Sequence, residues 1–478
     1  MGATGATGAT RAAGTTGTTG VTGASGARAA PRAVLAVTSA ATALTLMNYT
    51  APMLTLPAMA ADFGTAPAAQ AWLLNGTPLG LAVLLLVAGS LADEHGRRRV
   101  FLLGTLGLGL TTALGGLATS TLTFTLARIA QGGASAAVLA ASLGLLAHAY
   151  PTGPARIRAT GVWGAFVSAG IALGPLLAGG LAGLGGPAGW RWTYEVLAAA
   201  TLAVAALGVR TLAESRAPRE GRPDVAGSVT LGLALAALLT ALTLGRDGWL
   251  RPPVGVLGLA FLVLASVFVV VERRSGAPMV DLALFRRPAF RAATAGALFT
   301  GLAVIGLFSV LPALLQRGAH MAPLTTAWLF LLWSGTAFVV ALQARRLAGR
   351  LSAPYQLAVG FALSTAGVLA LLGTLQEASW PRLLPGLVAA GVGSGLLNAA
   401  LPRLAVDAVP PERAAMGSGA NNTARYIGSS AGVALFLALA TAGADTALVA
   451  SAVLGLAGAA VTLAAGRAWP RRSAGSAS

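Results

Sequence analysis

Long apolar runs constrain this chain more than any other feature of its sequence. About twenty helical residues cross the roughly 30 Å hydrocarbon core of a bilayer. Runs of that length with almost no charge recur from one end of the chain to the other, and only 10% of all residues are charged. An average soluble domain has about 25% charged residues. The sequence therefore predicts an all-α membrane protein that crosses the bilayer many times.

The spacing of the apolar runs predicts fourteen transmembrane helices. They lie near residues 34–58, 70–91, 100–119, 122–147, 159–182, 190–210, 225–245, 253–271, 292–315, 323–343, 355–374, 381–402, 415–440 and 446–466.

The arginines support this count, because they alternate with the spans. With both termini in the cytoplasm, five of the 32 basic residues fall in outer loops and two inside spans, which leaves 25 on the cytoplasmic side. Basic residues concentrate on that side of membrane proteins. We expect a multi-pass protein of the cell (plasma) membrane with both termini cytoplasmic. The absence of lysine and the abundance of Ala and Gly are typical of a GC-rich genome and favour a bacterial source.

Composition also excludes several classes of protein. The net charge of +18 does not indicate nucleic-acid binding, because the arginines lie in short loops between apolar runs. The absence of cysteine excludes disulfides, thiolate metal sites and cysteine nucleophiles. His95, His148 and His320 are far apart and have no metal-ligand spacing. We therefore expect no metal and no cofactor.

The stretch GSLADEHGRRRV, residues 89–100, lies between two apolar runs and is densely charged. Its arginines could serve only as topology anchors. That interpretation does not explain the carboxylate of Asp93 between two glycines, Gly89 and Gly96. Glycine permits a close turn because it lacks a Cβ. We expect a tight cytoplasmic turn between the second and third spans, with a role beyond topology.

This loop resembles the loop signature of the major facilitator superfamily, in the form Gly89-x-Leu91-Ala92-Asp93-x-x-Gly96-Arg97-Arg98-Arg99. Four further segments resemble a second signature of the superfamily, the antiporter signature of its exporters, and two signatures of its fourteen-helix drug:proton antiporter family. They are Arg128-x-x-Gln131-Gly132-Gly133-Ala134, Gly170-x-x-x-Gly174-Pro175-x-x-x-Gly179-Gly180, Gly189-Trp190-Arg191-Trp192 and Gly417-Ser418-Gly419-x-x-Asn422-Thr423-x-Arg425. One signature alone would be weak evidence, but five in order across residues 34–466 are strong.

The resemblance implies two six-helix bundles around a central cavity, with two extra helices between them. We expect a disordered cytoplasmic tail at 1–32, the N-terminal bundle at 33–222, the two-helix insert at 223–274, the C-terminal bundle at 275–467 and a second cytoplasmic tail at 468–478. Residues 345–350, RRLAGR, repeat the first loop in degraded form. Repeated halves around a site near the midplane are a usual transporter architecture.

The resemblance assigns a gating latch to the loop, formed by Gly89, Asp93, Gly96, Arg97 and Arg98. Such a latch holds one half of the transporter against the other and helps to set the conformational equilibrium. We expect Asp93 to face the start of the thirteenth span, around residues 415–419. Simple topology anchoring is the alternative.

Arg128 is expected to face the interior of the bundle. It lies about six residues into the fourth span, or roughly 10 Å deep. A charge at the centre of a span costs at least about 2.5 kcal/mol, so it needs a polar partner. Gln131 lies on the same helical face. The resemblance links this arginine to proton handling, and a structural arginine bonded to carbonyl groups is the alternative.

The fifth span carries the pattern that marks exporters in the family: Gly170, Gly174, Pro175 and Gly179. Small residues four apart allow helices to approach closely, and Pro175 should bend the helix. Packing alone could account for the glycines. The pattern as a whole, by resemblance, indicates export by antiport, although Ala178 stands where the family often has a glycine.

Polar residues at depth in other spans suggest a substrate cavity. Arg425 lies near the midplane of the thirteenth span, and the other candidates are Asn48, Asn398 and Asn422. Polar packing between helices is the alternative for the asparagines. Asn48 stands where the family usually has an acid, and it cannot titrate.

Proton antiport needs a titratable group, and by elimination Glu195 is the best candidate, with Asp93 second. Arg128 and Arg425 against one carboxylate argue against a simple lipophilic cation as substrate. A neutral, zwitterionic or anionic compound fits better.

These features predict an exporter of small hydrophobic or amphipathic compounds that is driven by the proton gradient and works by alternating access. Its partners are a small-molecule substrate, protons and the lipid bilayer, with no nucleic acid, and we expect a monomer. An importer or facilitator with the same fold is the alternative. A membrane-embedded enzyme would need a nucleophile–base pair, metal ligands or a carboxylate pair at depth, and the sequence offers none. A receptor that does not transport is the remaining alternative.

Overall fold

The computed structural model describes Gly2 and residues 31–150, 154–184, 186–215, 224–245, 248–275, 282–347, 352–375, 379–409 and 414–467. Regular secondary structure within these residues is helical throughout. Every predicted span overlaps a helical segment. Eleven helices of the described part are long and apolar enough to cross a membrane, and Gln70–Leu85 and Ala353–Leu369 are shorter apolar helices. The all-helical membrane class is confirmed, and the count of fourteen spans stays a prediction.

Six long helices make up the first half of the chain. They are α1 (Pro31–Asp62), α2 (Gln70–His95), α3 (Arg97–Gly116), α4 (Thr121–Ala149), α5 (Pro154–Leu181) and α6 (Trp190–Thr211), with the short helices η1 (Pro67–Ala69) and η2 (Gly186–Ala188) in connections. Ser120 caps α4 by accepting a hydrogen bond from the backbone nitrogen of Thr123, and the Thr123 hydroxyl accepts one from the backbone nitrogen of Ser120. This reciprocal capping box fixes where α4 begins.

Two helices follow and lead to the second half. They are α7 (Val225–Gly245) and α8 (Pro252–Arg274). The second half contains η3 (Leu282–Arg286), α9 (Pro288–Phe299), η4 (Thr300–Ile305), α10 (Gly306–Gly318), α11 (Pro323–Leu347), α12 (Ala353–Leu369), α13 (Trp380–Asp407), α14 (Ala414–Leu439) and α15 (Ala444–Arg467). Proline stands in the first turn of α8, α9 and α12, where its missing N–H costs nothing.

The segments α9, η4 and α10 form one continuous rod with a π-helical turn in its middle. The rod packs closely on α14 through glycines. A Cβ at Gly306 would lie 2.6 Å from the Cα of Gly432, and a Cβ at Gly428 would meet the carbonyl oxygen of Leu298. Close backbone approach of this kind holds α14, which carries Arg425, against the rod.

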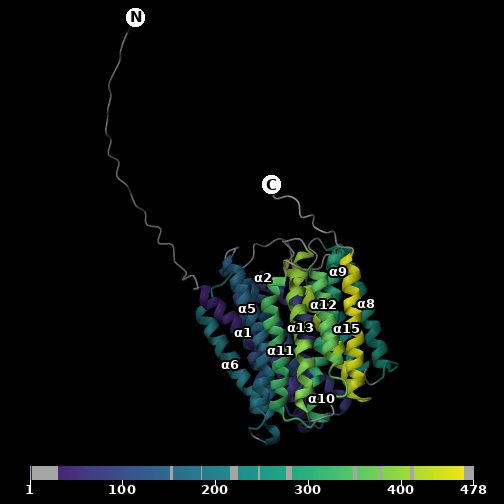
Figure 1. The fold of residues 1–478 in the computed structure, drawn as a ribbon. Coiled ribbons are helices and arrows are strands. Elements are labelled where there is room, and N and C mark those ends of the chain that lie inside the picture. The colour runs from purple at the N-terminus through teal and green to yellow at the C-terminus, as the bar shows by residue number, and fades with distance from the viewer. Residues whose placement is uncertain are drawn as a thin grey trace.

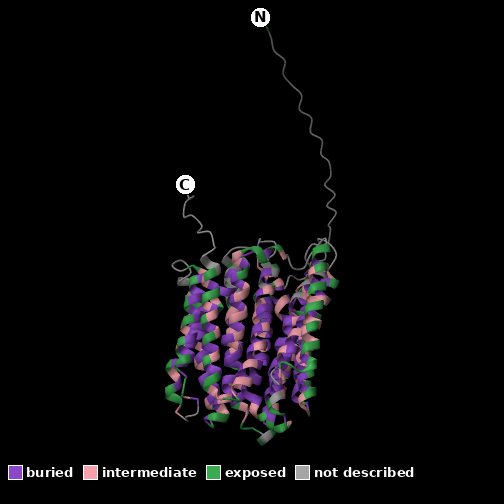
Figure 2. Ribbon diagram, turned by 90° about the vertical axis from the view of Figure 1, so that its right-hand side faces the viewer, coloured by how far each residue is buried: buried purple, intermediate pink, exposed green. Residues whose placement is uncertain are grey.

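Figure 1 shows that α1 begins and α15 ends at the same end of the bundle. We call this the terminal end, and the opposite end the far end. Exposed residues gather on the outward sides of the peripheral helices and buried ones towards the middle (Figure 2). On α8 the apolar residues Val256, Leu259 and Leu262 are 61–66% exposed. Such a surface suits a lipid environment, because soluble proteins rarely expose large contiguous apolar patches to water.

The two halves meet along α1, α2 and α5 on one side and α10, α11 and α14 on the other. Near the far end, Gln316 of α10 donates a hydrogen bond to the backbone carbonyl of Leu54 of α1 at 3.0 Å. Nearer the middle, Asn75 of α2 donates to the backbone carbonyl of Ser430 at 3.1 Å and to the hydroxyl of Thr243 at 3.3 Å. We call this boundary between the two halves the seam. Helix α7 contacts both halves beside the seam, through α2 and α14.

Candidate functional site

A fully buried arginine lies at the centre of a polar network in the first half. Arg128 of α4 is 1% exposed. One of its guanidinium nitrogens donates to the backbone carbonyl of Asn48 at 2.7 Å and also to the side-chain oxygen of Gln131. The arginine therefore ties α4 to α1 and lies on the same helical face as Gln131.

Two threonines complete the network. The amide nitrogen of Gln131 donates to the Oδ1 of Asn48 at 3.0 Å and to the hydroxyl of Thr112 at 2.6 Å. The hydroxyl of Thr77 donates to the Oε1 of Gln131 at 3.2 Å. The network thus connects α1, α2, α3 and α4. A fully connected network at a buried position holds its members in one geometry.

Every described hydrogen-bond partner in this network is neutral, so among these residues only dipoles compensate the positive charge of Arg128. Its Nε and second terminal nitrogen have no hydrogen-bond partner among the described residues. Asn48 is 0% exposed and belongs to the network. It is not among the described residues that line the cavity between the two halves of the chain. Asn48 and Arg128 are therefore placed in the wall behind that cavity.

A cavity of about 70 Å³ lies between the two halves. α1 and α5 form one wall, and η4, α10, α11, α13 and α14 form the other. Drug-sized ligands occupy pockets of about 300–1,000 Å³. A substrate of that size therefore requires the halves to move apart. The lining combines aromatic and hydroxyl side chains and includes Tyr49, Phe308, Ser309, Trp333, Ser334 and Tyr426.

Aromatic rings hold the cavity wall in a defined arrangement. Phe308 and Trp333 stack with ring centroids 4.1 Å apart and an interplanar angle of 8°. Across the seam between the halves, Tyr49 meets Tyr426 edge to face with centroids 5.9 Å apart. The hydroxyl of Tyr49 also lies 3.0 Å from the hydroxyl of Ser429, within hydrogen-bond distance. Tyr49 therefore links α1 to α14 directly beside the cavity.

Arg425 of α14 lies on the cavity wall. It is partly buried, its guanidinium lies 5.5 Å from the centre of the Tyr426 ring, and its Nε has no hydrogen-bond partner among the described residues. Asn398 of α13 lines the same cavity. Asn422 is partly buried on α14, and its neighbour Asn421 donates instead to the backbone carbonyl of Ala293 at 3.0 Å. The structure thus brings Arg425 and Asn398 together at the cavity.

The glycines of α5 place that helix against both halves. A Cβ at Gly170 would meet Ala43 of α1, and one at Gly174 would lie 2.6 Å from the backbone carbonyl oxygen of Met47. A Cβ at Gly179 would lie 2.8 Å from the Cβ of Ala327, which belongs to α11 in the other half. Pro175 lies inside α5. The motif therefore builds two close contacts, one within the first half and one across the seam.

The loop between α2 and α3 is reduced to a single residue. Gly96 has a φ of 113°, which is favourable only for glycine, and it separates the end of α2 from the start of α3. The expectation that Gly89 also forms the turn is wrong. Gly89 lies within α2, where a Cβ would meet nothing within 4 Å, because one left-handed residue is enough to reverse the chain.

The arginines of this loop contact the ends of α4 and α6. Arg97 donates to the backbone carbonyl of Gly144 at 3.3 Å, and Arg98 donates to that of Val209 at 2.8 Å. The backbone nitrogen of Arg98 donates to the carboxylate of Glu214 at 3.1 Å. These contacts lie within the first half. The side chain of Asp93 and the side chains of residues 414–416 and 418 fall outside what the structure describes, so the latch between the halves stays a prediction.

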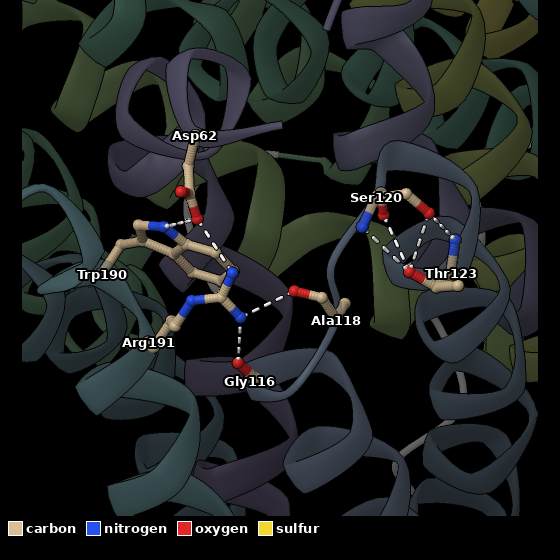
Figure 3. A network of polar contacts seen from close by, with 7 residues as sticks. All are labelled: Asp62, Gly116, Ala118, Ser120, Thr123, Trp190 and Arg191. Atoms are coloured by element: carbon tan, nitrogen blue, oxygen red, sulfur yellow. Dashed lines mark hydrogen bonds and ion pairs between the residues drawn. The ribbon is translucent and has the colours of Figure 1, made fainter. Parts of the chain in front are cut away.

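A second polar cluster closes the first half at the far end (Figure 3). Asp62 accepts hydrogen bonds from the indole nitrogen of Trp190 at 3.1 Å and from Arg191 at 2.9 Å. Arg191 also donates to the backbone carbonyls of Gly116 and Ala118 at 2.7 and 2.6 Å. The Trp-Arg pair at the start of α6 thus clamps α1, α3 and α6 together.

Glu195 lies one turn further along α6 from this clamp. It is partly buried, and its carboxylate lies beside Gly116 of α3, where a Cβ would contact it. The structure does not bring it together with Arg128, which donates hydrogen bonds to Asn48 and Gln131. Arg191, which could have paired with it, pairs with Asp62 instead.

Several residues of the site carry no signal in the sequence. Thr77, Thr112 and Tyr49 stand in apolar runs without a recognisable motif, and only the packing of distant helices brings them to Arg128 and the cavity. Trp333 and Phe308 are 25 residues apart and stack only because α10 and α11 lie side by side at the cavity. Among the described residues, no group of three acidic or histidine side chains could hold a metal ion.

Two groups of long apolar helices with an aromatic and polar cavity between them are typical of a secondary membrane transporter. The chain belongs to the Major Facilitator Superfamily, to which its residues 38–433 match.

The chain is similar to known sequences and to solved structures. Over 383 residues, 80% of this chain and 71% of the relative, it is 33% identical to "Multidrug resistance protein Stp" of Mycobacterium tuberculosis (strain CDC 1551 / Oshkosh). Over 407 residues, 83% of this chain and 79% of the relative, it is 34% identical to "Puromycin resistance protein pur8" of Streptomyces alboniger. A bacterial homolog of the human lysosomal transporter Spinster, solved in an inward-facing and unoccupied conformation, has a TM-score of 0.67 at 17% identity and covers 92% of this chain and 98% of its own. At that identity it supports the fold alone.

Proposed function

We propose that this protein exports small hydrophobic or amphipathic compounds, such as drugs or antibiotics, by alternating access. The observation that carries the proposal is the cavity in the seam between the halves, lined by aromatic rings and hydroxyl groups. Membership of the superfamily and the resistance functions in the names of two relatives support it. A site between two halves is exposed to either side when the halves rock about it.

The orientation follows from the arginines. Both termini lie in the cytoplasm, because that side then holds most of the basic loops. The far end, where Gln316 contacts Leu54, is then the outer end. The protein acts as a monomer in the plasma membrane of a bacterium. Residues 33–222 and 275–467 form the two moving bundles, and the insert at 223–274 lies beside the seam.

Transport by everted membrane vesicles tests the proposal. Vesicles from cells that produce the protein, given an imposed pH gradient and a panel of hydrophobic and amphipathic compounds, should accumulate at least one compound, and a protonophore should abolish this accumulation. An importer or facilitator predicts the opposite direction or no response to the gradient. Vesicles that accumulate no compound of the panel would contradict the proposal.

We propose the proton gradient as the energy source and Glu195 as the group that titrates during the cycle. Its carboxylate is partly buried beside Gly116, close to the clamp that joins α1, α3 and α6. The Arg128 network holds Asn48 in its centre and contains no titratable carboxylate among its described members. Arg128 and Gln131 then transmit the change in protonation between the helices that their network connects.

Replacing Glu195 by glutamine should separate proton coupling from substrate movement. In Glu195→Gln, substrate-induced proton flux is expected to vanish while counterflow of labelled substrate survives, because binding and alternating access need no net proton transfer. Both are measured in proteoliposomes with an internal pH dye. The matched control is Asp445→Asn, a carboxylate at the far end that accepts a hydrogen bond from Gly373. Unchanged proton flux in Glu195→Gln would place the coupling elsewhere.

Replacing Asp93 by asparagine tests the proposed latch. Asp93→Asn should reduce transport and shift the ratio of inward-facing to outward-facing molecules, because one state loses an interaction with a charged group. The ratio is measured from distances between paired spin labels at each end of the bundle. Glu94→Gln, at the neighbouring position, is the control. Full transport with an unchanged ratio in Asp93→Asn would reduce the loop to a topology anchor.

A further inference from the structure

The charge of the cavity wall narrows the class of substrate. Among the described residues that line the cavity, Arg425 is the one ionised side chain, and none is a carboxylate. Its guanidinium is partly buried, carries an Nε without a hydrogen-bond partner among the described residues, and has Tyr426 as its nearest ring contact at 5.5 Å. A contact with an aromatic face compensates only a small part of the lost hydration of a cation.

The described carboxylates are engaged at other places. Asp62 pairs with Arg191 at the far end, Glu214 lies 4.0 Å from Arg99 at the terminal end, and Asp445 accepts from Gly373. Glu195 lies beside Gly116. Of the remaining two, Asp224 directly precedes α7 and Glu272 lies in α8. Among the described residues, no carboxylate therefore balances the positive charge of Arg425 at the cavity wall.

The remaining lining specifies the body of the ligand. The Phe308–Trp333 stack and the Tyr49–Tyr426 pair present ring faces and edges on two sides of the cavity. Flat aromatic groups pack well against such surfaces. Ser394, which accepts a hydrogen bond from the indole nitrogen of Trp333 at 3.2 Å, adds a hydroxyl group to the lining.

We propose that the cavity selects aromatic organic anions, with Arg425 binding the anionic group and the aromatic walls holding the ring system. A guanidinium can bind a carboxylate through two parallel hydrogen bonds, which a neutral or cationic group cannot reproduce. A cation of the same shape meets the unbalanced charge of Arg425 and is rejected. The inference rests on the proposed function in that it takes the cavity to be the substrate site.

Three probes with one ring system test the inference: 9-anthracenecarboxylate, 9-anthracenecarboxamide and 9-(aminomethyl)anthracene, which are an anion, a neutral compound and a cation at neutral pH. Their binding to the purified full-length protein in detergent is measured by anthracene fluorescence. The carboxylate should bind about tenfold more tightly than the carboxamide or better, and the cation most weakly, because a partly buried charge pair is formed only with the anion.

Variants at one position separate recognition from folding. Arg425→Gln should lower carboxylate affinity to that of the carboxamide and leave carboxamide affinity unchanged, so that carboxamide binding reports an intact cavity. Arg425→Lys, which keeps the charge, should retain a reduced preference for the carboxylate. Arg273→Gln, at an exposed position at the end of α8, should leave all three affinities unchanged.

Two results of the binding experiment would overturn the inference. One is equal affinity of the unmodified protein for the carboxylate and the carboxamide, or no binding of the carboxylate. The other is an equal loss of affinity for all three probes in both Arg425→Gln and Arg425→Lys, which would make the residue structural. Export of neutral or cationic compounds by vesicles, with no preference for the anion, would overturn this inference and leave the proposed function standing. Vesicles that move no compound would overturn both.

Discussion

Valine at position 174 is expected to abolish transport, whereas valine at position 180 of the same helix is expected to leave it intact. Gly174 of α5 lies against α1, where an added Cβ would meet the hydroxyl of Thr50 and lie 2.6 Å from the carbonyl oxygen and 2.9 Å from the Cα of Met47. Backbone atoms cannot rotate away as a side chain can. Overpacking at such a contact costs about 1–3 kcal/mol, and here it pushes α1, a wall of the cavity, away from α5.

Gly180 provides the matched control for this substitution. A Cβ there would meet nothing within 4 Å, so Gly180→Val adds the same side chain to the same helix without a clash. Counterflow of labelled substrate in proteoliposomes, at equal amounts of reconstituted protein, should fall by about tenfold or more in Gly174→Val, since about 1.4 kcal/mol corresponds to a factor of ten. Equal activity of the two variants would show that the α1–α5 contact does not need glycine.

Replacing Arg128 by methionine is expected to stop transport and leave the protein folded. Removing the buried charge relieves its desolvation, so stability changes little or rises, as found when buried ionic groups are replaced by apolar ones of similar size. The link from α4 to the backbone of Asn48 and to Gln131 is lost, however. Gln131 still accepts a hydrogen bond from Thr77, but the backbone carbonyl of Asn48 loses Arg128 as its donor. An acceptor left without its donor costs about 1–3 kcal/mol, and α1 is no longer held to α4 in one geometry.

The measurement for Arg128→Met is substrate uptake in vesicles beside a thermal unfolding curve of the purified protein. Uptake should fall by about tenfold or more, because about 1.4 kcal/mol is enough for that factor, with a midpoint of unfolding close to the original. Arg273→Gln, which removes an exposed arginine, should change neither quantity. An Arg128→Met variant that transports at the original rate would show that the network is only packing.

The sequence allowed the helical fold to be predicted because membrane spans depend on local composition. Runs of about twenty apolar residues and the positions of the arginines located each α-helix from α1 to α15, with α9 and α10 as one span, but not the short helices η1, η2 and η3. The turn at Gly96 was placed correctly, and Gly89 was not, because a helix continues through glycine when nothing in the surroundings ends it. The π-helical turn at Thr300–Ile305 has no local signature, since it forms where the rod meets α14.

Hydrogen bonds within the site were predictable only where the donor and the acceptor lie on one helix. Arg128 and Gln131 are three residues apart, and that spacing places them on one face. The links from Asn48 to Thr112 and from Tyr49 to Ser429 join residues 64 and 380 positions apart. They depend on how helices pack, and no pattern in the sequence specifies them. Arg425 was identified because a charge at depth in a span is costly, and its place on the cavity wall came from the structure.

The central claim is that one cavity between the halves is exposed in turn to each side of the membrane. The chain contains no cysteine, so single cysteines can be introduced without removing native ones. Ser168 of α5 and Ser334 of α11 line the cavity from opposite halves, and serine to cysteine is a small change. Ser266, exposed on α8, provides a lipid-facing control.

Labelling with a charged, membrane-impermeant thiol reagent, applied to oriented vesicles from either side, is the most direct measurement. Alternating access predicts that Ser168→Cys and Ser334→Cys react from both sides and that a transported substrate slows both reactions, while Ser266→Cys reacts from neither side. Reaction of both cavity cysteines from only one side, with and without substrate and a pH gradient, would contradict the account.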